Sequence, residues 1–266
     1  MLEKLSLDGK TIVVTGGGTG LGREMVRHLA RAGADLVIAA RRPGPIEEAA
    51  AEVRQMGRRA LAITTDATAS SQVNQMVQRI LAEFGKIDVL VNNAGGGDVA
   101  TPIWDITDEQ WHKFLDINLT SAFYCSRAVA KHMADRGKGR IINIASGYGL
   151  RGGRDNFMYT AGKGGTVNLT RCMAISLSRY GITTVAIAPG FFPTIATRGR
   201  SDVPARGDYI PMGRVGLPEE LGPVVVMLAS DATSYFNGEV FYADGGGLAG
   251  GAAPTGYAPE IPLPVA

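Results

Sequence analysis

The feature that most constrains this chain is the regular alternation of short, apolar, β-rich runs with longer amphipathic segments. Several runs are apolar throughout, which is typical of parallel strands that are covered on both faces. Strand–helix alternation of this length implies right-handed crossovers and an α/β fold, a doubly wound sheet of about seven parallel strands with helices on both faces. Strands are expected at 11–15, 36–40, 60–64, 88–91, 140–145, 183–188 and 239–242, and helices at 20–32, 46–56, 70–84, 108–135, 155–180 and 218–230.

No repeat or linker divides the 266 residues, so we expect a single domain over residues 1–248. Residues 194–216 contain many Gly and Pro residues and follow the end of a predicted strand. Ligands bind beyond the carboxyl ends of strands in such sheets, so this segment is expected to be a substrate loop. Residues 249–266 are rich in Pro and Gly. They are expected to form an extended tail that is either disordered or bridges subunits.

The composition limits the classes of partner and of site. Apolar residues make up 45% of the chain and the net charge is +2, so the chain can bury a large core and has no general attraction for nucleic acid. No apolar stretch reaches the roughly 18 residues of a membrane span, and the amino terminus has no signal-peptide pattern, so a cytoplasmic protein is expected. The cysteines and histidines have no metal-ligand spacing, and Cys125 and Cys172 are expected to be buried, reduced thiols.

A glycine-rich turn joins the first predicted strand to the first predicted helix. It reads Thr15-Gly-Gly-Gly-Thr-Gly-Leu-Gly22, and the spacing of Gly16, Gly20 and Gly22 differs from the common G-x-G-x-x-G pattern. Glycines let the backbone approach a pyrophosphate, which then lies at the positive end of the helix dipole. A tight turn alone needs no ligand. At this position in a doubly wound sheet, however, it predicts a dinucleotide site and a Rossmann-type fold.

The end of the second predicted strand indicates which dinucleotide is preferred. An NAD site has an acidic residue there to bind the ribose hydroxyls. Here the strand ends in Ala-Ala-Arg41-Arg42, and Asp35 lies at the opposite end of the strand. Guanidinium groups suit a 2′-phosphate, so NADP(H) is expected to be preferred over NAD(H). The alternative is that both arginines are solvated loop residues.

Three further segments point to a known family. Asn92-Asn-Ala-Gly95 ends the fourth predicted strand, Ile142-Asn-Ile-Ala-Ser146 ends the fifth, and Tyr159-Thr-Ala-Gly-Lys163 lies on the next helix. With the glycine turn, in this order, they make the chain resemble the short-chain dehydrogenase/reductase family over nearly its whole length. One departure is Gly164-Gly165, where that family more often has helix-favouring residues.

Four residues are expected to be catalytic. Tyr159 and Lys163 are four residues apart on one helical face, where an ammonium group favours the phenolate and tunes a general acid/base. Ser146 can hold a carbonyl oxygen, or it can simply cap the following turn. Asn118 falls inside an apolar helical stripe and therefore needs a hydrogen-bond partner. The resemblance implies a role for Asn118 in a water relay beside the lysine.

The resemblance also implies which residues bind the cofactor. Lys163 would bind the nicotinamide ribose, Asn92 would line the cofactor cleft, and Asp66 with Ala67 would contact the adenine, although Asp66 could also cap the following helix. No metal is expected. The full expected set is Gly16, Gly20, Leu21, Gly22, Arg41, Arg42, Asp66, Ala67, Asn92, Ala94, Gly95, Tyr159, Lys163, Pro189, Gly190 and Thr194.

The activity implied by the resemblance is hydride transfer between a ketone and its alcohol, with Tyr159 as general acid/base. The two arginines after the second strand make NADP(H) the expected cofactor. Residues 189–194 and 212–220 resemble gluconate 5-dehydrogenases and 3-oxoacyl reductases, whereas the glycine turn resembles dienoyl-CoA reductases. The sequence therefore does not decide between a 3-oxoacyl, a sugar-acid and another secondary-alcohol substrate. Two alternative functions also remain, an enoyl- or dienoyl-thioester C=C reductase and a non-catalytic NADP-binding regulator.

The expected substrate cleft has two kinds of side chain. Aromatic residues would suit an apolar substrate, and arginines could pair with a carboxylate or phosphate, although solvated loop arginines are the alternative. The resemblance further implies a homotetramer that packs through the helices at 108–135 and 155–180 and through the final helix and strand. The aromatic residues are Trp104, Tyr148, Phe191, Phe192 and Tyr209, and the arginines are Arg151, Arg154, Arg198, Arg200 and Arg206.

Overall fold

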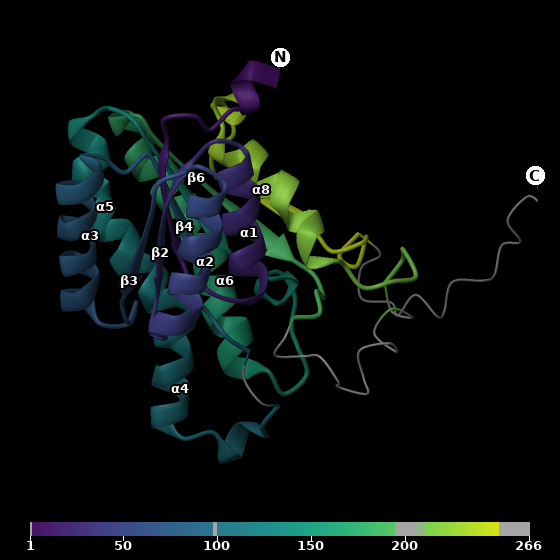
Figure 1. The fold of residues 1–266 in the computed structure, drawn as a ribbon. Coiled ribbons are helices and arrows are strands. Elements are labelled where there is room, and N and C mark those ends of the chain that lie inside the picture. The colour runs from purple at the N-terminus through teal and green to yellow at the C-terminus, as the bar shows by residue number, and fades with distance from the viewer. Residues whose placement is uncertain (1, 98–99, 195–206, 208–209, 250–266) are drawn as a thin grey trace, which may run out of the picture.

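The computed structural model describes residues 2–97, 100–194, 207 and 210–249. Within these residues a seven-stranded sheet lies between two layers of helices, as Figure 1 shows. Every neighbouring pair of strands is parallel and the order is β3-β2-β1-β4-β5-β6-β7, which confirms the predicted doubly wound fold. The strands are β1 (Thr11–Thr15), β2 (Asp35–Ala40), β3 (Ala60–Thr64), β4 (Val89–Asn92), β5 (Gly139–Ile144), β6 (Ile182–Pro189) and β7 (Val240–Ala243).

The helices follow the predicted segments, with differences at their ends. The second helix begins three residues before its predicted start because Pro43 and Pro45 lie in its first turn, where a backbone N–H has no helical partner to lose. None of the described helices combines the length and the apolarity needed to cross a bilayer. The helices are α1 (Gly20–Arg31), α2 (Pro43–Gln55), α3 (Ser70–Phe84), α4 (Asp108–Leu115), α5 (Ser121–Asp135), α6 (Phe157–Leu177) and α8 (Leu221–Ala229).

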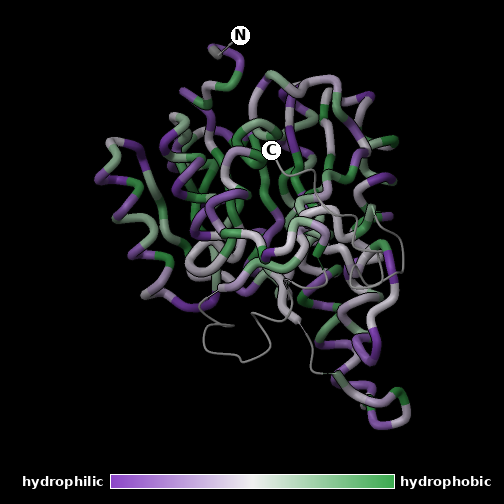
Figure 2. Tube along the Cα trace, turned by 90° about the vertical axis from the view of Figure 1, so that its right-hand side faces the viewer, coloured by the Kyte–Doolittle hydropathy of each residue, from purple (hydrophilic) through white to green (hydrophobic). Residues whose placement is uncertain are grey.

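Successive residues of the central strand enter two separate cores. Ile12 and Val14 of β1 pack in one core with side chains of α1, α2 and α8. Val13 belongs to a second core with side chains of α3 and α5, because neighbouring side chains of a strand point to opposite faces. In Figure 2 the hydrophobic trace accordingly lies inside the molecule and much of the outer helical trace is hydrophilic. Both faces of the sheet are thus covered, as the apolar runs predicted.

The two cysteines have different environments. Cys125 on α5 is 1% exposed, and burial raises the pKa of its thiol to about 12. Cys172 on α6 is exposed, so the prediction of two buried thiols is wrong for this residue. The buried face of α6 passes through Thr166, Thr170 and Met173, and position 172 lies outside that stripe.

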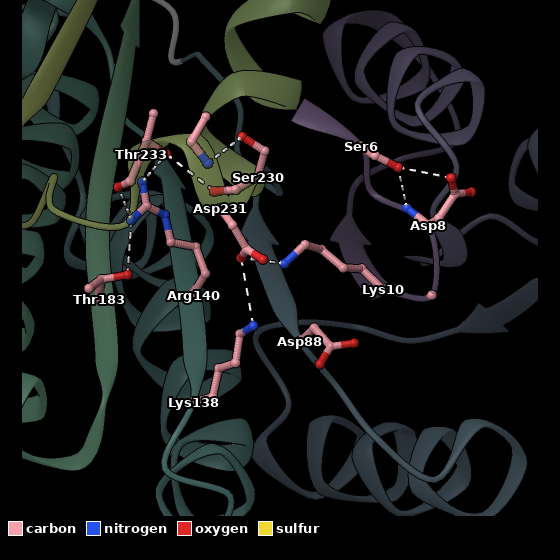
Figure 3. A network of polar contacts seen from close by, with 12 residues as sticks. Ser6, Asp8, Lys10, Asp88, Lys138, Arg140, Thr183, Ser230, Asp231 and Thr233 are labelled. Atoms are coloured by element: carbon pink, nitrogen blue, oxygen red, sulfur yellow. Dashed lines mark hydrogen bonds and ion pairs between the residues drawn. The ribbon is translucent and has the colours of Figure 1, made fainter. Parts of the chain in front are cut away.

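The edge of the sheet at the amino ends of the strands is held by polar contacts (Figure 3). The Asp231 carboxylate accepts a hydrogen bond from Lys10 Nζ at 2.8 Å and pairs with Lys138 at 3.7 Å. The buried Arg140 guanidinium donates to the Thr183 hydroxyl at 2.9 Å and to the Thr233 hydroxyl at 3.0 Å. Burial lowers the pKa of Arg140 to about 10, which leaves it charged at neutral pH. This edge is therefore tied together, and the functional cavity lies at the opposite edge.

Candidate active site

A cavity of about 760 Å³ lies at the carboxyl ends of the strands. It extends from Arg41 and Asp66, which follow β2 and β3, past the glycine turn after β1, to Ser146 after β5 and Pro189 at the end of β6. Parallel sheets bind ligands at this edge, where the strand order reverses on either side of β1 and β4. Of the predicted site residues, those that line it are Gly16, Leu21, Gly22, Arg41, Arg42, Asp66, Ala67, Ala94, Gly95, Ser146, Tyr159, Lys163, Pro189, Gly190 and Thr194.

The glycine turn forms the floor of this cavity. Gly16 (φ +67°) and Gly20 (φ +55°) are in the left-handed region, which favours glycine. A Cβ atom at Gly22 would overlap the carbonyl oxygen of Gly16, so only glycine allows the turn to close against α1. Gly20 does not line the cavity itself, and the methyl group of Thr194 lies over it, 3.4 Å from where a Cβ would be. Gly16, Gly18 and Gly22 of this turn line the cavity at the start of α1, where backbone without side chains forms a cradle suited to a pyrophosphate.

The segment after β4 locks the glycine turn in place. The Thr15 hydroxyl accepts hydrogen bonds from the backbone N–H groups of Asn93 at 3.1 Å and Ala94 at 3.0 Å. The Asn93 side-chain amide donates to the carbonyl oxygens of Thr15 at 2.9 Å and Gly16 at 3.1 Å. Asn93 thus positions the cradle and also lines the cavity. Sequence reasoning missed Asn93, together with the lining residues Gly18, Thr19 and Gly96.

The structure corrects the expectation that Asn92 lines the cleft. The Asn92 side chain is buried and donates to Asn143 Oδ1 at 2.8 Å and to the Ser126 hydroxyl at 2.9 Å. Its position shares the face of Leu90, which packs in the core beneath α3 and α5. The alternation of side chains along the strand was therefore the signal that could have excluded Asn92 from the cavity. Its bonds tie β4 to β5 and α5.

The cationic end of the cavity lies beyond β2. Arg41 and Arg42 are exposed, line the cavity, and form no ion pair with a carboxylate of the residues described. Asp66 faces them across the cavity and accepts from the Thr68 N–H at 2.9 Å and the Thr68 hydroxyl at 2.8 Å. Burial raises the pKa of Asp66, but the bonds from Thr68 and the charge of Arg41 outweigh it, so the net pKa is lowered. Asp66 caps its loop and is also available at the cavity wall.

Three side chains with complementary chemistry meet at the other end. Tyr159 and Lys163 are one turn apart on α6, and Lys163 Nζ lies 5.8 Å from the centroid of the Tyr159 ring. Lys163 is 4% exposed and donates to the carbonyl oxygen of Ile144 at 2.8 Å. Burial lowers the pKa of Lys163 to about 8. The Ser146 hydroxyl accepts a hydrogen bond from the Tyr148 N–H at 3.2 Å. This bond does not use the hydrogen of the Ser146 hydroxyl. The capping role of Ser146 and a role toward a ligand are therefore compatible.

Asn118 lies beneath this group in a π-helical turn, Asp116–Thr120, that joins α4 to α5. The predicted helical segment 108–135 is confirmed, and this π-helical turn lies within it. The Asn118 side chain donates to the carbonyl oxygens of Gly96 at 2.9 Å and Phe114 at 3.1 Å and accepts from the Gly96 N–H at 3.1 Å. Asn118 does not line the cavity. Its side chain instead holds the segment after β4 against the lysine, since a Cβ on Gly95 would lie 3.0 Å from Asn118 Oδ1 and 3.1 Å from Lys163 Nζ.

The glycines of α6 account for part of the departure at 164–165. A Cβ on Gly162 would lie 2.9 Å from the Asn118 Cβ, and one on Gly165 would lie 2.7 Å from Leu119 Cδ2. The Thr166 hydroxyl on the same face donates to the Asn118 carbonyl at 2.7 Å. Gly162 and Gly165 therefore allow α6 to approach the π-helical turn closely. Nothing in the structure explains Gly164.

The loop after β6 forms the remaining wall through Gly190 and Thr194, and the loop after β7 packs behind it. A Cβ on Gly190 would lie 2.7 Å from the Cα of Asp244, so the two loops touch there. Of the predicted substrate loop 194–216, residues 195–206, 208 and 209 lie outside the described residues, as do residues 250–266 of the predicted tail. Arg198, Arg200, Arg206 and Tyr209 fall in these segments.

Comparison with known proteins shows which family and which characterised sequences this chain is similar to. Residues 10–203 match the family model described as short chain dehydrogenase. The chain is 40% identical over 255 residues to 2-dehydro-3-deoxy-D-gluconate 5-dehydrogenase of Escherichia coli, which covers 94% of this chain and 99% of that protein. It is 36% identical over 246 residues to cis-4-hydroxycyclohexanecarboxylate dehydrogenase of Sinomonas cyclohexanicum, with 89% and 96% covered.

A solved structure gives the same result for the fold. A protein from Beutenbergia cavernae, described as an NAD(P)-dependent gluconate 5-dehydrogenase with NADP bound at low occupancy, superposes with a TM-score of 0.87 at 36% identity. The match covers 92% of this chain and 99% of that one.

Proposed function

Since this chain belongs to the short-chain dehydrogenase/reductase family and is an oxidoreductase acting on CH–OH groups, we propose that it interconverts a ketone and its secondary alcohol with NADP(H). The observation that carries the proposal is the meeting of Ser146, Tyr159 and Lys163 at one end of a cavity whose other end is cationic. The dinucleotide fits this cavity because the glycine turn leaves a backbone cradle at the start of α1. In this proposal the nicotinamide, when bound, supplies or accepts the hydride.

The side chains handle the oxygen and its proton. In the reducing direction the Ser146 hydroxyl donates a hydrogen bond to the ketone oxygen and stabilises the negative charge that develops there. The Tyr159 hydroxyl gives that oxygen its proton, and in the oxidising direction the phenolate removes it. The Lys163 ammonium, held beside the ring by the Ile144 carbonyl, favours the phenolate. Asn118 is a positioning residue that keeps Gly95 and Gly96 against the lysine.

Turnover of ketones by the purified protein tests this function. We expect NADPH to be oxidised in the presence of 4-oxocyclohexanecarboxylate, 5-keto-D-gluconate or a 3-oxoacyl thioester, with one alcohol formed for each NADPH consumed. Spectrophotometry at the NADPH absorbance band and chromatography of the product measure the two quantities. Tight NADPH binding without turnover across this set would instead favour a regulatory binding protein.

The cofactor preference depends on Arg41 and Arg42. Replacing both by serine is expected to raise the KM for NADPH by about tenfold or more and to leave the KM for NADH within about twofold, because a charge-assisted bond to the 2′-phosphate is lost. Arg31→Ser combined with Arg179→Ser, which removes the same two charges outside the cavity lining, serves as control. Wild-type protein that uses NADH as efficiently as NADPH would contradict the preference.

We also propose a cytoplasmic homotetramer that packs through α5 and α6. Exposed apolar side chains on these helices, Phe123 at 42% and Ile175 at 80%, support an interface there.

A further inference from the structure

The loop after β5 carries an arginine that the proposed mechanism does not use. The loop begins at Ser146 and passes through a 3-10 turn, Gly147–Gly149, to the start of α6. Tyr148 lies in this turn, and its ring meets the Tyr159 ring edge-on, with the centroids 6.3 Å apart. Tyr148 is therefore a direct neighbour of the group that transfers the proton.

The Tyr148 ring is held on its other sides by the same loop. Its backbone N–H donates to the Ser146 hydroxyl. A Cβ on Gly153 would lie 2.8 Å from Tyr148 Cε1, so the loop backbone packs directly on the ring. The ring is thus fixed next to Tyr159, which lines the cavity, although Tyr148 itself is not part of the lining.

Arg151 is anchored on this ring. Its guanidinium carbon lies 5.5 Å from the centroid of the Tyr148 ring, within the range of a cation–π contact. Arg151 is exposed and forms no ion pair with any carboxylate in the part of the chain that the structure describes. Some arginines differ in this respect: Arg23, Arg27 and Arg214 each pair with a glutamate. The tyrosine therefore holds a cation near the active site without neutralising it.

The backbone around Arg151 is constrained. Asp155 adopts φ +57°, a conformation that residues with a side chain rarely take. Its carbonyl oxygen accepts from the Thr101 N–H at 3.0 Å, which ties this loop to the segment after β4. Strained residues of this kind persist where the surrounding structure holds them and concentrate at ligand sites. The Asp155 carboxylate is the nearest acidic group in sequence, and it forms no ion pair with Arg151.

We propose that Arg151 selects substrates that carry a carboxylate, by pairing with it while the ketone oxygen faces Ser146 and Tyr159. This inference rests on the proposed carbonyl chemistry. Because one aromatic ring separates the guanidinium from Tyr159, the carboxylate and the ketone must be several carbon atoms apart. A 4-oxocycloalkanecarboxylate fits this requirement, whereas a 2-oxo acid is too short. Arg154 lies in the same loop, and among the described residues it is Arg151 that makes the cation–π contact with Tyr148.

A matched pair of ketones tests the inference. Wild-type, Arg151→Gln and Arg154→Gln proteins are assayed with 4-oxocyclohexanecarboxylate and with its uncharged amide. Arg151→Gln is expected to lower kcat/KM for the acid by about 10- to 100-fold, mostly through KM, and to change the value for the amide by less than about threefold. Arg151→Lys should recover part of the loss, and the Arg154→Gln control should keep the wild-type ratio of acid to amide.

The two possible failures are distinguishable. An acid-to-amide ratio that is the same in wild type and Arg151→Gln overturns the role of Arg151 and leaves the carbonyl chemistry intact. If wild type reduces neither ketone, the proposed function fails for this class, and binding decides the inference. Calorimetric titration of the protein with NADP⁺ and cyclohexanecarboxylate should then give a Kd about tenfold weaker for Arg151→Gln. An equal Kd, or no binding to wild type, would refute it.

Discussion

Replacing Tyr159 by phenylalanine is expected to lower kcat for NADPH-dependent ketone reduction by about 10²- to 10⁴-fold, because it removes the hydroxyl that transfers the proton. The aromatic ring remains, so the edge-on contact with Tyr148 and the packing against Lys163 are kept. The KM for both substrates and the melting temperature should therefore stay close to the wild-type values. Steady-state kinetics and a thermal melt separate these effects.

The matched control for this prediction is Tyr180→Phe. Tyr180 is 43% exposed in the short helix after α6 and lies outside the cavity lining. Both variants lose one phenolic hydroxyl group, so they differ only in where that hydroxyl lies in the protein. Equal activities of the two variants would mean that Tyr159 is not the proton donor.

Replacing Lys163 by methionine is expected to have opposite effects on activity and stability. Activity should fall by about 10²-fold or more, because the ammonium no longer favours the phenolate. The protein without cofactor should become more stable at pH 7. Burial lowers the lysine pKa from 10.5 to about 8, and each pKa unit corresponds to about 1.4 kcal/mol, so the buried charge costs about 3 kcal/mol. Loss of the bond to the Ile144 carbonyl offsets about 1 kcal/mol of the gain.

The pH dependence of the stability difference between wild type and Lys163→Met tests whether the buried ammonium group causes it. Between about pH 8 and 10.5 the unfolded chain holds a proton on Lys163 that the folded protein has released, so wild-type stability rises with pH in this range. The methionine variant lacks this group. The free energy of unfolding of the variant, measured by chemical denaturation, should therefore exceed that of wild type at pH 7, and the excess should shrink toward pH 10. A variant that is less stable at pH 7, or an advantage independent of pH, would show that burial of the ammonium is not costly.

Much of the fold follows from local pattern. All seven predicted strands match observed ones to within one residue at each end, because a strand buried on both faces is a continuous apolar run with clear boundaries. The π-helical turn at Asp116–Thr120 was not predicted. Its cause is tertiary, since the hydrogen bonds of Asn118 to Gly96 and of Thr166 to Asn118 join segments far apart in the sequence.

For the site, the sequence predicts the positions of some residues correctly and of others incorrectly. Tyr159 and Lys163 could be placed together because a spacing of four residues on a helix has one geometric meaning. The resemblance implies that Asn92 lines the cleft, but the alternation of side chains along β4 turns Asn92 into the core, and Asn93 lines the cavity instead. The contact of Arg151 with Tyr148 depends on the path of an irregular loop, which no periodicity in the sequence describes.

The position of transferred deuterium tests the central claim most directly. Wild-type protein is incubated with NADPH deuterated at C4, in the 4R and the 4S form separately, and with 4-oxocyclohexanecarboxylate or cyclohex-2-enone. We expect one form to place a single deuterium on the carbon that bears the new hydroxyl group, in both products. Deuterium on the ring carbon β to a surviving ketone would identify a C=C reductase, and deuterium that stays entirely on the cofactor would exclude hydride transfer to these substrates.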